Sequence, residues 1–162
     1  MLKKILLVLL VIFIVIQFFK PAKNISAQTS PNDITGMLAV PSDVQTILKK
    51  ACNDCHSNNT KYPWYAKVQP VAWWLNDHII DGKRHLNFSE FKTYPLRRQY
   101  EKLEETIDLV KKDEMPLWSY TVIHRDAVLN DDEKQKITSW AEAIRADMKA
   151  TYPADSLAKK KS

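Results

Sequence analysis

The sequence predicts an all-α fold, with one domain of about four helices after an N-terminal apolar segment. Three observations support this fold class. Apolar residues recur at helical spacing in four separate stretches, and no stretch has a convincing strand pattern. The chain of 162 residues has room for one domain. It holds only two glycines, Gly36 and Gly82, too few for the many tight turns of β-sandwiches and barrels or for phosphate-binding loops.

The first residues have the pattern of an export segment. Lys3 and Lys4 precede an apolar run from Ile5 to Phe19 in which only Gln17 is polar. No comparable basic cluster follows the run immediately, so the positive-inside rule places the rest of the chain on the periplasmic side of the cytoplasmic membrane. We expect an uncleaved signal anchor that passes the membrane once.

A cleaved signal peptide is the alternative, because Ile25, Ser26 and Ala27 form an acceptable cleavage site before Gln28. The remaining chain would then be soluble in the periplasm. The two interpretations differ only in whether the apolar run stays attached to the mature protein.

Composition divides the chain into four parts. Residues 1–20 are the anchor or signal peptide, and the polar residues 21–41 are expected to be a flexible tether. Residues 42–150 form the folded domain, and residues 151–162 are expected to be a basic disordered tail. The formal net charge of +5 owes much to lysines near the two termini, so the folded part has almost no net charge. No nucleic-acid binding is expected from this distribution.

The first two helices of the domain have clear start signals. Ser42 with Gln45 three residues later resembles a capping box, and the helix should run to about His56. A second helix should begin at Pro70, which suits the first helical turn, and should end at Gly82.

The last two helices follow from the same kind of evidence. Inward-facing apolar residues predict a third helix from about Leu96 to Lys112. Asn130 with Glu133 forms a second capping box, and the apolar stripe of this fourth helix extends to Met148.

Both cysteines lie in the stretch ACNDCHSNNT at residues 51–60. A disulfide between Cys52 and Cys55 would close a loop too short to constrain much of the unfolded chain. A thioredoxin-like dithiol requires the pair to open a helix after a strand, whereas here it ends a helix. Neither interpretation explains the pair well.

A structural zinc site is a third interpretation. It needs four ligands, but after Cys52, Cys55 and His56 the chain offers only distant histidines and no second CxxC pair. The distant histidines are His78, His85 and His124.

The interpretation that uses all three residues is covalent attachment of one haem c. In a CxxCH sequence two thiols bind the porphyrin and the following imidazole binds iron. Positions i, i+3 and i+4 share one face of a helical turn, so Cys52, Cys55 and His56 can reach one porphyrin together.

Three stretches carry a family resemblance: ACNDCHSNNTKYPWYAKVQPVAWWL, DGKRHLNFSEF and DEMPLWSYTVIH. Together they resemble the membrane-anchored haem-binding domain family of bacterial exported proteins, which is similar to small mono-haem cytochromes c. The resemblance extends from about Ser42 to Trp140 and implies a small cytochrome c-like fold around one haem.

Small electron-transfer cytochromes hold iron between a histidine and a methionine. Met115 is the predicted second axial ligand, because Pro116 disfavours helical geometry at Met115 and so moves it out of the third helix. A methionine that fills a core gap is the alternative for this residue. The rival ligands are His78, His85 and His124, whereas Met148 and Met37 fit poorly.

Other residues are candidates for the haem surroundings. Aromatic side chains that could line its pocket are Trp64, Tyr65, Trp73, Trp74, Phe88, Phe91, Trp118 and Tyr120. Donors for its propionates are Lys83, Arg84, Arg97 and Arg98. The carbonyl of Pro63 or Pro70 should accept a hydrogen bond from His56, as implied by the resemblance to cytochromes c.

These features predict an electron carrier that exchanges single electrons with redox partner proteins and is not itself an enzyme. Two alternatives remain: a peroxidase-like enzyme with His124, or His85 with Glu90, above the iron, and a haem-based gas or redox sensor.

Overall fold

The computed structural model describes residues 1–158, and this part of the chain forms nine α-helices and three short 3₁₀ turns. It contains no β-strand in that range; one isolated antiparallel bridge joins Ile25 and Asn59. The predicted all-α fold class is confirmed.

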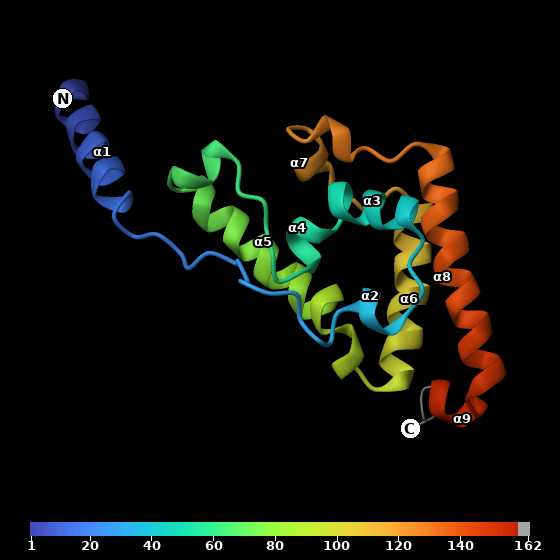
Figure 1. Ribbon diagram of the computed structural model, residues 1–162. Helices are drawn as coiled ribbons and strands as arrows, with labels where there is room; N and C mark the ends of the chain where they lie inside the picture. The colour runs from blue at the N-terminus through green and yellow to red at the C-terminus, as the bar shows by residue number, and fades with distance from the viewer. Residues whose placement is uncertain (159–162) are drawn as a thin grey trace.

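Figure 1 shows the order of these elements. The long helices are α1 (Leu2–Ile16), α3 (Ser42–Ala51), α5 (Val71–His85), α6 (Leu96–Lys111) and α8 (Asp131–Thr151). The short helices are α2 (Ile34–Met37), α4 (Asn53–His56), α7 (Trp118–Thr121) and α9 (Ala154–Leu157). The 3₁₀ turns are η1 (Trp64–Lys67), η2 (Phe88–Thr93) and η3 (Arg125–Ala127).

The domain is a helical assembly with α8 at one end and α1 at the other. Helix α6 packs along α8, α3 also contacts α8, and α4 packs against α5 (Figure 1). The cysteine motif, formed by Cys52 and the short helix α4, therefore lies in the middle of the domain, between α5 and the α6–α8 pair.

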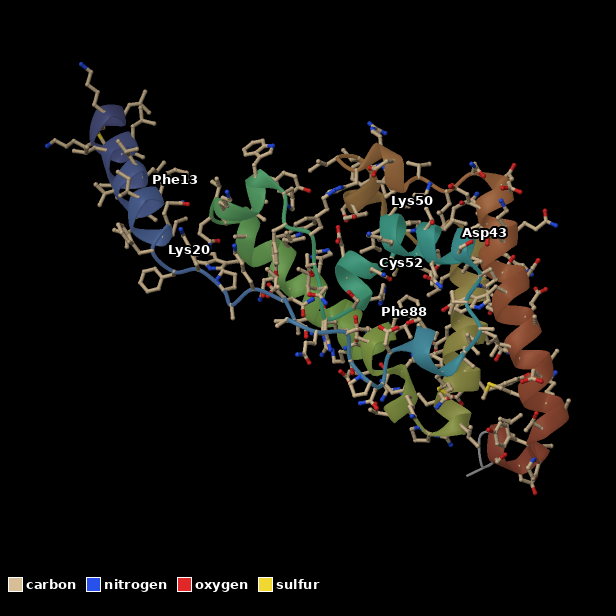
Figure 2. The ribbon with its side chains drawn as sticks, in the orientation of Figure 1. Phe13, Lys20, Asp43, Lys50, Cys52 and Phe88 are labelled. Carbon is tan, nitrogen blue, oxygen red and sulfur yellow. The ribbon has the colours of Figure 1, made fainter. Side chains whose placement is uncertain are left out.

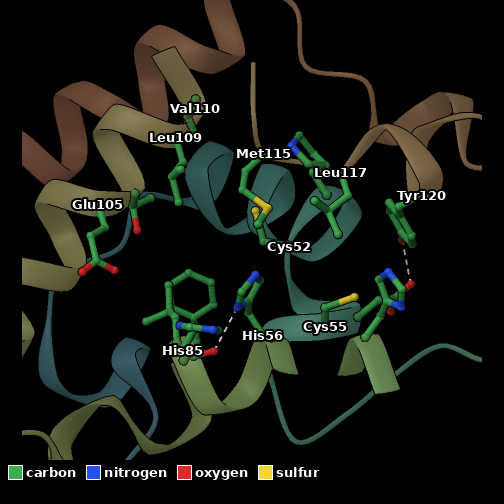
Figure 3. Close-up of a pocket in the computed structure, with 18 of the residues that line it drawn as sticks. Cys52, Cys55, His56, His85, Glu105, Leu109, Val110, Met115, Leu117 and Tyr120 are labelled. Carbon is green, nitrogen blue, oxygen red and sulfur yellow. Dashed lines mark hydrogen bonds between the residues drawn. The ribbon is translucent and has the colours of Figure 1, made fainter. Parts of the chain in front are cut away.

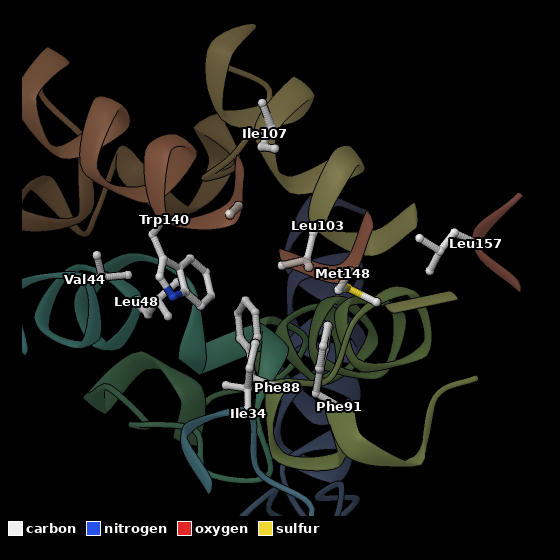
Figure 4. Packing of buried hydrophobic residues seen from close by; sticks show 11 residues of the cluster. Ile34, Val44, Leu48, Phe88, Phe91, Leu103, Ile107, Trp140, Met148 and Leu157 are labelled. Carbon is white, nitrogen blue, oxygen red and sulfur yellow. The ribbon is translucent and has the colours of Figure 1, made fainter. Parts of the chain in front are cut away.

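The main core lies where α3, α6, α8 and η2 meet. Leu103 and Ile107 of α6 face Trp140 of α8, and Val44 and Leu48 of α3 complete the contact (Figure 4). These residues follow the predicted helical spacing, so each helix buries one apolar stripe. The buried stripes hold the frame around the cysteine motif.

Two helix starts test the predicted capping boxes. The box of Asn130 and Glu133 is present at the start of α8, so that prediction is confirmed. At the start of α3 the predicted box is wrong, because Pro41 is the N-cap and Ser42 is already helical. The Gln45 side chain donates to the carbonyl of Val40 instead.

The first predicted helix is broken near its end. α3 ends at Ala51 and α4 begins at Asn53, because Cys52 between them has φ −124°. The second predicted helix is longer than expected. Gly82 does not end α5, which continues to His85.

Residues 21–41 were expected to be a free tether but contact the domain. Ile34 is buried in the main core, with Met37, Leu38 and Val40 packed beside it. The Trp140 indole also donates to the Ala39 carbonyl at 3.2 Å. The polar average composition of the segment conceals these few apolar residues, which bury enough surface to hold it on the domain.

Part of the predicted disordered tail, residues 151–162, also packs on the domain. Residues 154–157 form α9, and Leu157 is buried in the main core. Residues 159–162 lie outside the described residues.

Helix α1 makes little contact with the domain, and its apolar side chains are largely exposed. Within residues 1–158 no helix combines the length and the apolar character needed to span a membrane.

Candidate functional site

The cysteine motif forms one helical turn. The backbone N–H groups of Cys55 and His56 both donate to the carbonyl of Cys52, at 3.2 and 3.0 Å. This turn brings the two thiols and the imidazole together, as the spacing predicts. Both cysteines are free thiols in the structure.

Asp54, inside the motif, holds the turn from the outside. Its carboxylate accepts a hydrogen bond from the Tyr120 hydroxyl at 2.8 Å and another from the Lys61 backbone N–H at 2.9 Å. The Thr60 hydroxyl donates to the Asp54 carbonyl at 2.6 Å. The turn is therefore tied both to the loop that follows it and to α7.

A second network holds the chain just after the motif. The Ser89 hydroxyl accepts from the Asn58 backbone N–H at 3.1 Å, and Glu90 accepts from the Asn58 side chain at 2.9 Å. Asn87 in turn donates to the Asn58 side-chain oxygen at 3.0 Å. The LNFSEF stretch thus supports the motif, a role that its spacing in the sequence does not reveal.

His56 has a defined orientation. Its Nδ1 lies 2.9 Å from the Leu86 carbonyl, and the Phe88 ring meets its ring edge-on with centroids 6.3 Å apart. A carbonyl can only accept, so Nδ1 carries the proton and Nε2 keeps a free lone pair. Burial lowers the pKa of His56, because the charged imidazolium is poorly solvated there.

The predicted partner of His56 is wrong: neither Pro63 nor Pro70 accepts this hydrogen bond. Leu86 is the C-cap of α5, so no continuing helix uses its carbonyl, and that carbonyl is available to His56.

Gly82 explains how α5 can approach the motif so closely. A β-carbon at this position would lie 2.7 Å from the Cys55 carbonyl oxygen and 3.1 Å from the Cys55 Cβ. Any larger residue would push α5 away from the turn. A glycine that the sequence suggested as a helix end is therefore a packing requirement.

Met115 enters the site from the loop after α6. Asp113 has φ 59°, and its N–H donates to the Val110 carbonyl while the Glu114 N–H donates to the Leu109 carbonyl. This pair of bonds is a Schellman motif, which ends the helix and turns the chain. The turn directs Met115 back toward the cysteine motif.

A cavity of about 370 Å³ lies between these elements. Cys52, Cys55, His56 and Met115 all line it, so the structure brings the four predicted site residues together. Figure 3 shows His56 and Met115 projecting into it from opposite walls. The lining residues from the end of α6 and the Met115 loop are apolar, namely Leu109, Val110, Pro116 and Leu117, whereas Lys102, Glu105 and Thr106 line the cavity from earlier turns of α6.

Burial raises the pKa of both thiols, that of Cys52 to about 12 and that of Cys55 to about 11. Desolvation is the main cause for both thiols. The negative charge of Cys55 raises the pKa of Cys52 further, and the negative charge of Asp54 does the same for Cys55. Thiol–disulfide exchange needs a thiolate, which these surroundings disfavour. The site is therefore poorly suited to a redox dithiol.

The donors for a zinc ion are not assembled. In the part of the chain that the structure describes, no three His, Cys, Asp or Glu side chains come together as ligands. The rival histidines are placed differently from Met115. His78 and His85 line the cavity from α5, which packs against the α4 turn that carries His56. His124 is hydrogen-bonded to the Tyr65 hydroxyl and stacks on Tyr120.

Only part of the predicted aromatic wall is present. Phe88 and Tyr120 line the cavity, but Phe91 belongs to the main core. Trp64 and Trp118 are largely exposed, at 77% and 80%. The remaining predicted aromatic residues, Tyr65, Trp73 and Trp74, are not among the lining residues.

The predicted basic residues also lie elsewhere. None of Lys83, Arg84, Arg97 and Arg98 lines the cavity. They pair with other groups: Lys83 with Asn24, Arg84 with Asp81, Arg97 with Glu101, and Arg98 with the Arg84 carbonyl. The basic residues that do line the cavity, besides His56, are His78, His85 and Lys102.

A comparison with known families matches residues 11–143 to the family described as "Haem-binding domain". The match covers most of the chain and includes all four predicted site residues. No curated protein and no solved structure matches the chain with significance.

Proposed function

Since the chain belongs to the haem-binding domain family, we propose that it carries one covalently attached haem c and acts as a mono-haem electron carrier. The observation that carries this proposal is the position of His56 and Met115, which project from opposite walls of a cavity that both thiols line.

The residues fit the cofactor in size and in chemistry. The cavity of about 370 Å³ falls within the range of about 300–1,000 Å³ that is usual for ligand pockets. Its walls are mostly apolar, as a porphyrin face requires, and His85 and Lys102, which pairs with Glu105 at the cavity, would supply donors that propionates need. We assign the propionates to these two residues in place of the basic residues that the sequence suggested.

Cys52 and Cys55 would attach the cofactor. Each thiol would add its sulfur to one carbon of a porphyrin vinyl group and its proton to the other. A C–S bond then replaces the vinyl π bond, and no oxidant or reductant is consumed. The hydrogen bonds of Asp54 and Asn58 hold the turn in place for this attachment.

His56 and Met115 would be the residues that hold the iron. The bond from Nδ1 to the Leu86 carbonyl leaves Nε2 as the metal-binding atom of His56 and increases its basicity. The neutral thioether of Met115 would favour the reduced state of a bound haem. When bound, the haem supplies reversible one-electron chemistry.

Two observations favour a carrier over a peroxidase-like enzyme. Such an enzyme needs a polar acid–base group on the face opposite His56, where the side chains next to Met115 are apolar; Glu105 of α6 also lines the cavity but pairs with Lys102. Of the residues considered for that role, Glu90 bonds Asn58 and Asn32 and His124 bonds Tyr65, while His85 lines the cavity from α5, the helix that packs against the His56 turn. The other alternative, a haem-based gas sensor, would require that a gas displace Met115 from the iron.

We further propose that the apolar N-terminal segment holds the domain at the periplasmic face of the cytoplasmic membrane, where it meets redox partner proteins. Cleavage before Gln28 would remove Asn24, whose side chain donates to the Ser57 carbonyl and the Thr60 hydroxyl. Lys83 also donates to Asn24. The folded domain thus uses residues that a signal peptidase would discard.

Intact mass and a visible spectrum test the haem proposal. Protein matured with the cytochrome c assembly machinery should retain the mass of one haem after acid and solvent extraction. A variant with both cysteines replaced by serine should lose the haem under the same extraction. An unmodified wild-type mass would reject covalent attachment.

A further inference from the structure

The end of the apolar segment is fastened to one end of the domain. Gln17 donates from its side chain to the Gln69 carbonyl at 3.2 Å and accepts from the Gln69 N–H at 2.9 Å. The Phe19 carbonyl accepts from the Gln69 side chain at 2.9 Å and from the Trp73 indole at 2.7 Å. We call these four residues the clasp.

The clasp fixes the position at which the N-terminal segment leaves the domain. Gln69 is fully buried, at 0% exposed, and its side-chain oxygen also accepts from the Trp73 N–H. A buried amide with all these partners holds its neighbours in one arrangement. Helix α1 therefore leaves the domain beside η1 and the start of α5, at the end remote from α8 (Figures 1 and 2).

Large apolar side chains are exposed around the clasp. Val71 and Trp74 are three residues apart in α5 and so share one side of its first turn, and Val68 lies in the extended segment just before the helix. They are 37%, 38% and 44% exposed, and Phe18 beside the clasp is 81% exposed. We call these four residues the aromatic face.

The charges near the aromatic face are mostly positive. Residues 17–24 and 61–77 contain four lysines and one carboxylate, the exposed Asp77 three residues after Trp74. All four lysines are exposed: Lys20, Lys23, Lys61 and Lys67. Aromatic rings with flanking lysines are typical of the headgroup region of a bilayer, and anionic lipids attract such lysines.

We propose that the aromatic face lies on the surface of an anionic phospholipid bilayer, so that the haem domain is docked on the membrane in one orientation. This inference rests on the proposed membrane attachment of the N-terminal segment. It adds that the clasp carries the apolar run of α1 directly into the lipid while the aromatic face enters the headgroup layer. A protein partner on this face is the competing occupant.

Photo-crosslinking in vesicles tests the orientation. The full-length haem protein is reconstituted in vesicles of phosphatidylethanolamine and phosphatidylglycerol, with a photo-reactive amino acid in place of Val71. The matched control carries it in place of Ala143, an exposed residue of α8. Mass spectrometry should find lipid adducts at position 71 and none at position 143.

A clasp variant separates docking from attachment. Gln17→Leu keeps α1 apolar but removes both hydrogen bonds to the Gln69 backbone. This variant should remain with the vesicles and show a several-fold loss of lipid adduct at position 71. The proposal is overturned if the vesicle-bound protein with the photo-reactive residue at position 71 and an intact Gln17 gives no lipid adduct there. It is also overturned if this protein gives only protein adducts at position 71 in native membranes. Protein that does not stay with the vesicles would refute the attachment as well.

Discussion

At the scale of single residues, Gly82 has no room for a side chain. A β-carbon there would lie 2.7 Å from the Cys55 carbonyl, so Gly82→Ala must move α5 or the motif. Overpacking of this kind costs about 1–3 kcal/mol of unfolding free energy. We expect that loss in chemical denaturation, together with a lower yield of haem-loaded protein.

Gly36 is the matched control, since a β-carbon there would meet nothing within 4 Å. Gly36→Ala in the short helix α2 should leave stability unchanged or raise it by less than about 1 kcal/mol. If the two alanine variants unfold alike, the close approach of α5 to Cys55 is not a constraint.

Asp113 is the single residue whose backbone conformation ends α6. Its φ of 59° lies in the left-handed region, where a β-branched side chain is strained. Asp113→Val and Asp113→Gly both remove the ion pair with Lys134, so comparing them isolates the backbone effect.

We expect the valine variant to be less stable than the glycine variant by about 1–2 kcal/mol. Thermal unfolding of both variants measures this difference. The valine variant should also weaken any bond from Met115 to iron, because the Schellman turn that directs Met115 is disturbed. Equal stability of the two variants would mean that the turn does not depend on this conformation.

At the scale of elements, α3 and α8 are joined by an ion pair at the start of α8. Lys50 lies 2.6 Å from the Glu133 carboxylate, which also closes the capping box with Asn130. The hydrogen bond from Lys50 is the main cause that lowers the pKa of Glu133 below its ordinary value. The pair therefore stabilises the folded state above the ordinary pKa, and this contribution is lost as the pH falls through the lowered pKa.

Glu133→Gln should thus cost about 1 kcal/mol at neutral pH, because glutamine can still cap but cannot pair with Lys50 as a charge. The difference from wild type should vanish in acid, where Glu133 is protonated in both states. Urea unfolding over a pH series measures it. Glu142→Gln, at an exposed pair with Lys111, is the control and should change stability little. A constant deficit at every pH would contradict the linkage.

At the scale of the whole molecule, the N-terminal segment is part of the folded structure. A chain that begins at Gln28 lacks Asn24 and its bonds to Ser57, Thr60 and Lys83. Each part-buried hydrogen bond is worth about 0.5–1.5 kcal/mol. We expect this shortened protein, and the full chain with Asn24→Ala, to melt at a lower temperature than wild type. An unchanged melting temperature would show that these contacts do not stabilise the domain.

The sequence allows prediction of the features that depend on near neighbours. The apolar stripes of α6 and α8, the capping box of Asn130 and the shared face of the cysteine motif all arise within one or two helical turns. The place of Met115 at the cavity has a local signal as well, since it follows a helix and precedes Pro116; its bond to iron stays a prediction.

The features that were missed depend on residues far apart in the chain. The carbonyl that orients His56 belongs to Leu86, thirty residues away. The burial of Ile34 needs a surface built by α3 and η2, which average composition cannot reveal. Gly82 has its role only because α5 crosses the motif there. Such contacts depend on how the helices assemble, and no single stretch encodes them.

The central claim is that His56 and Met115 hold the iron of one haem between them. Carbon monoxide binding to the reduced protein, followed in the visible spectrum, tests it most directly. The wild-type protein should resist carbon monoxide, and its oxidised form should show a weak near-infrared band from sulfur-to-iron charge transfer. Met115→Ala should bind carbon monoxide, lose that band and have a lower reduction potential. Wild-type protein that binds carbon monoxide as readily as Met115→Ala would contradict the claim.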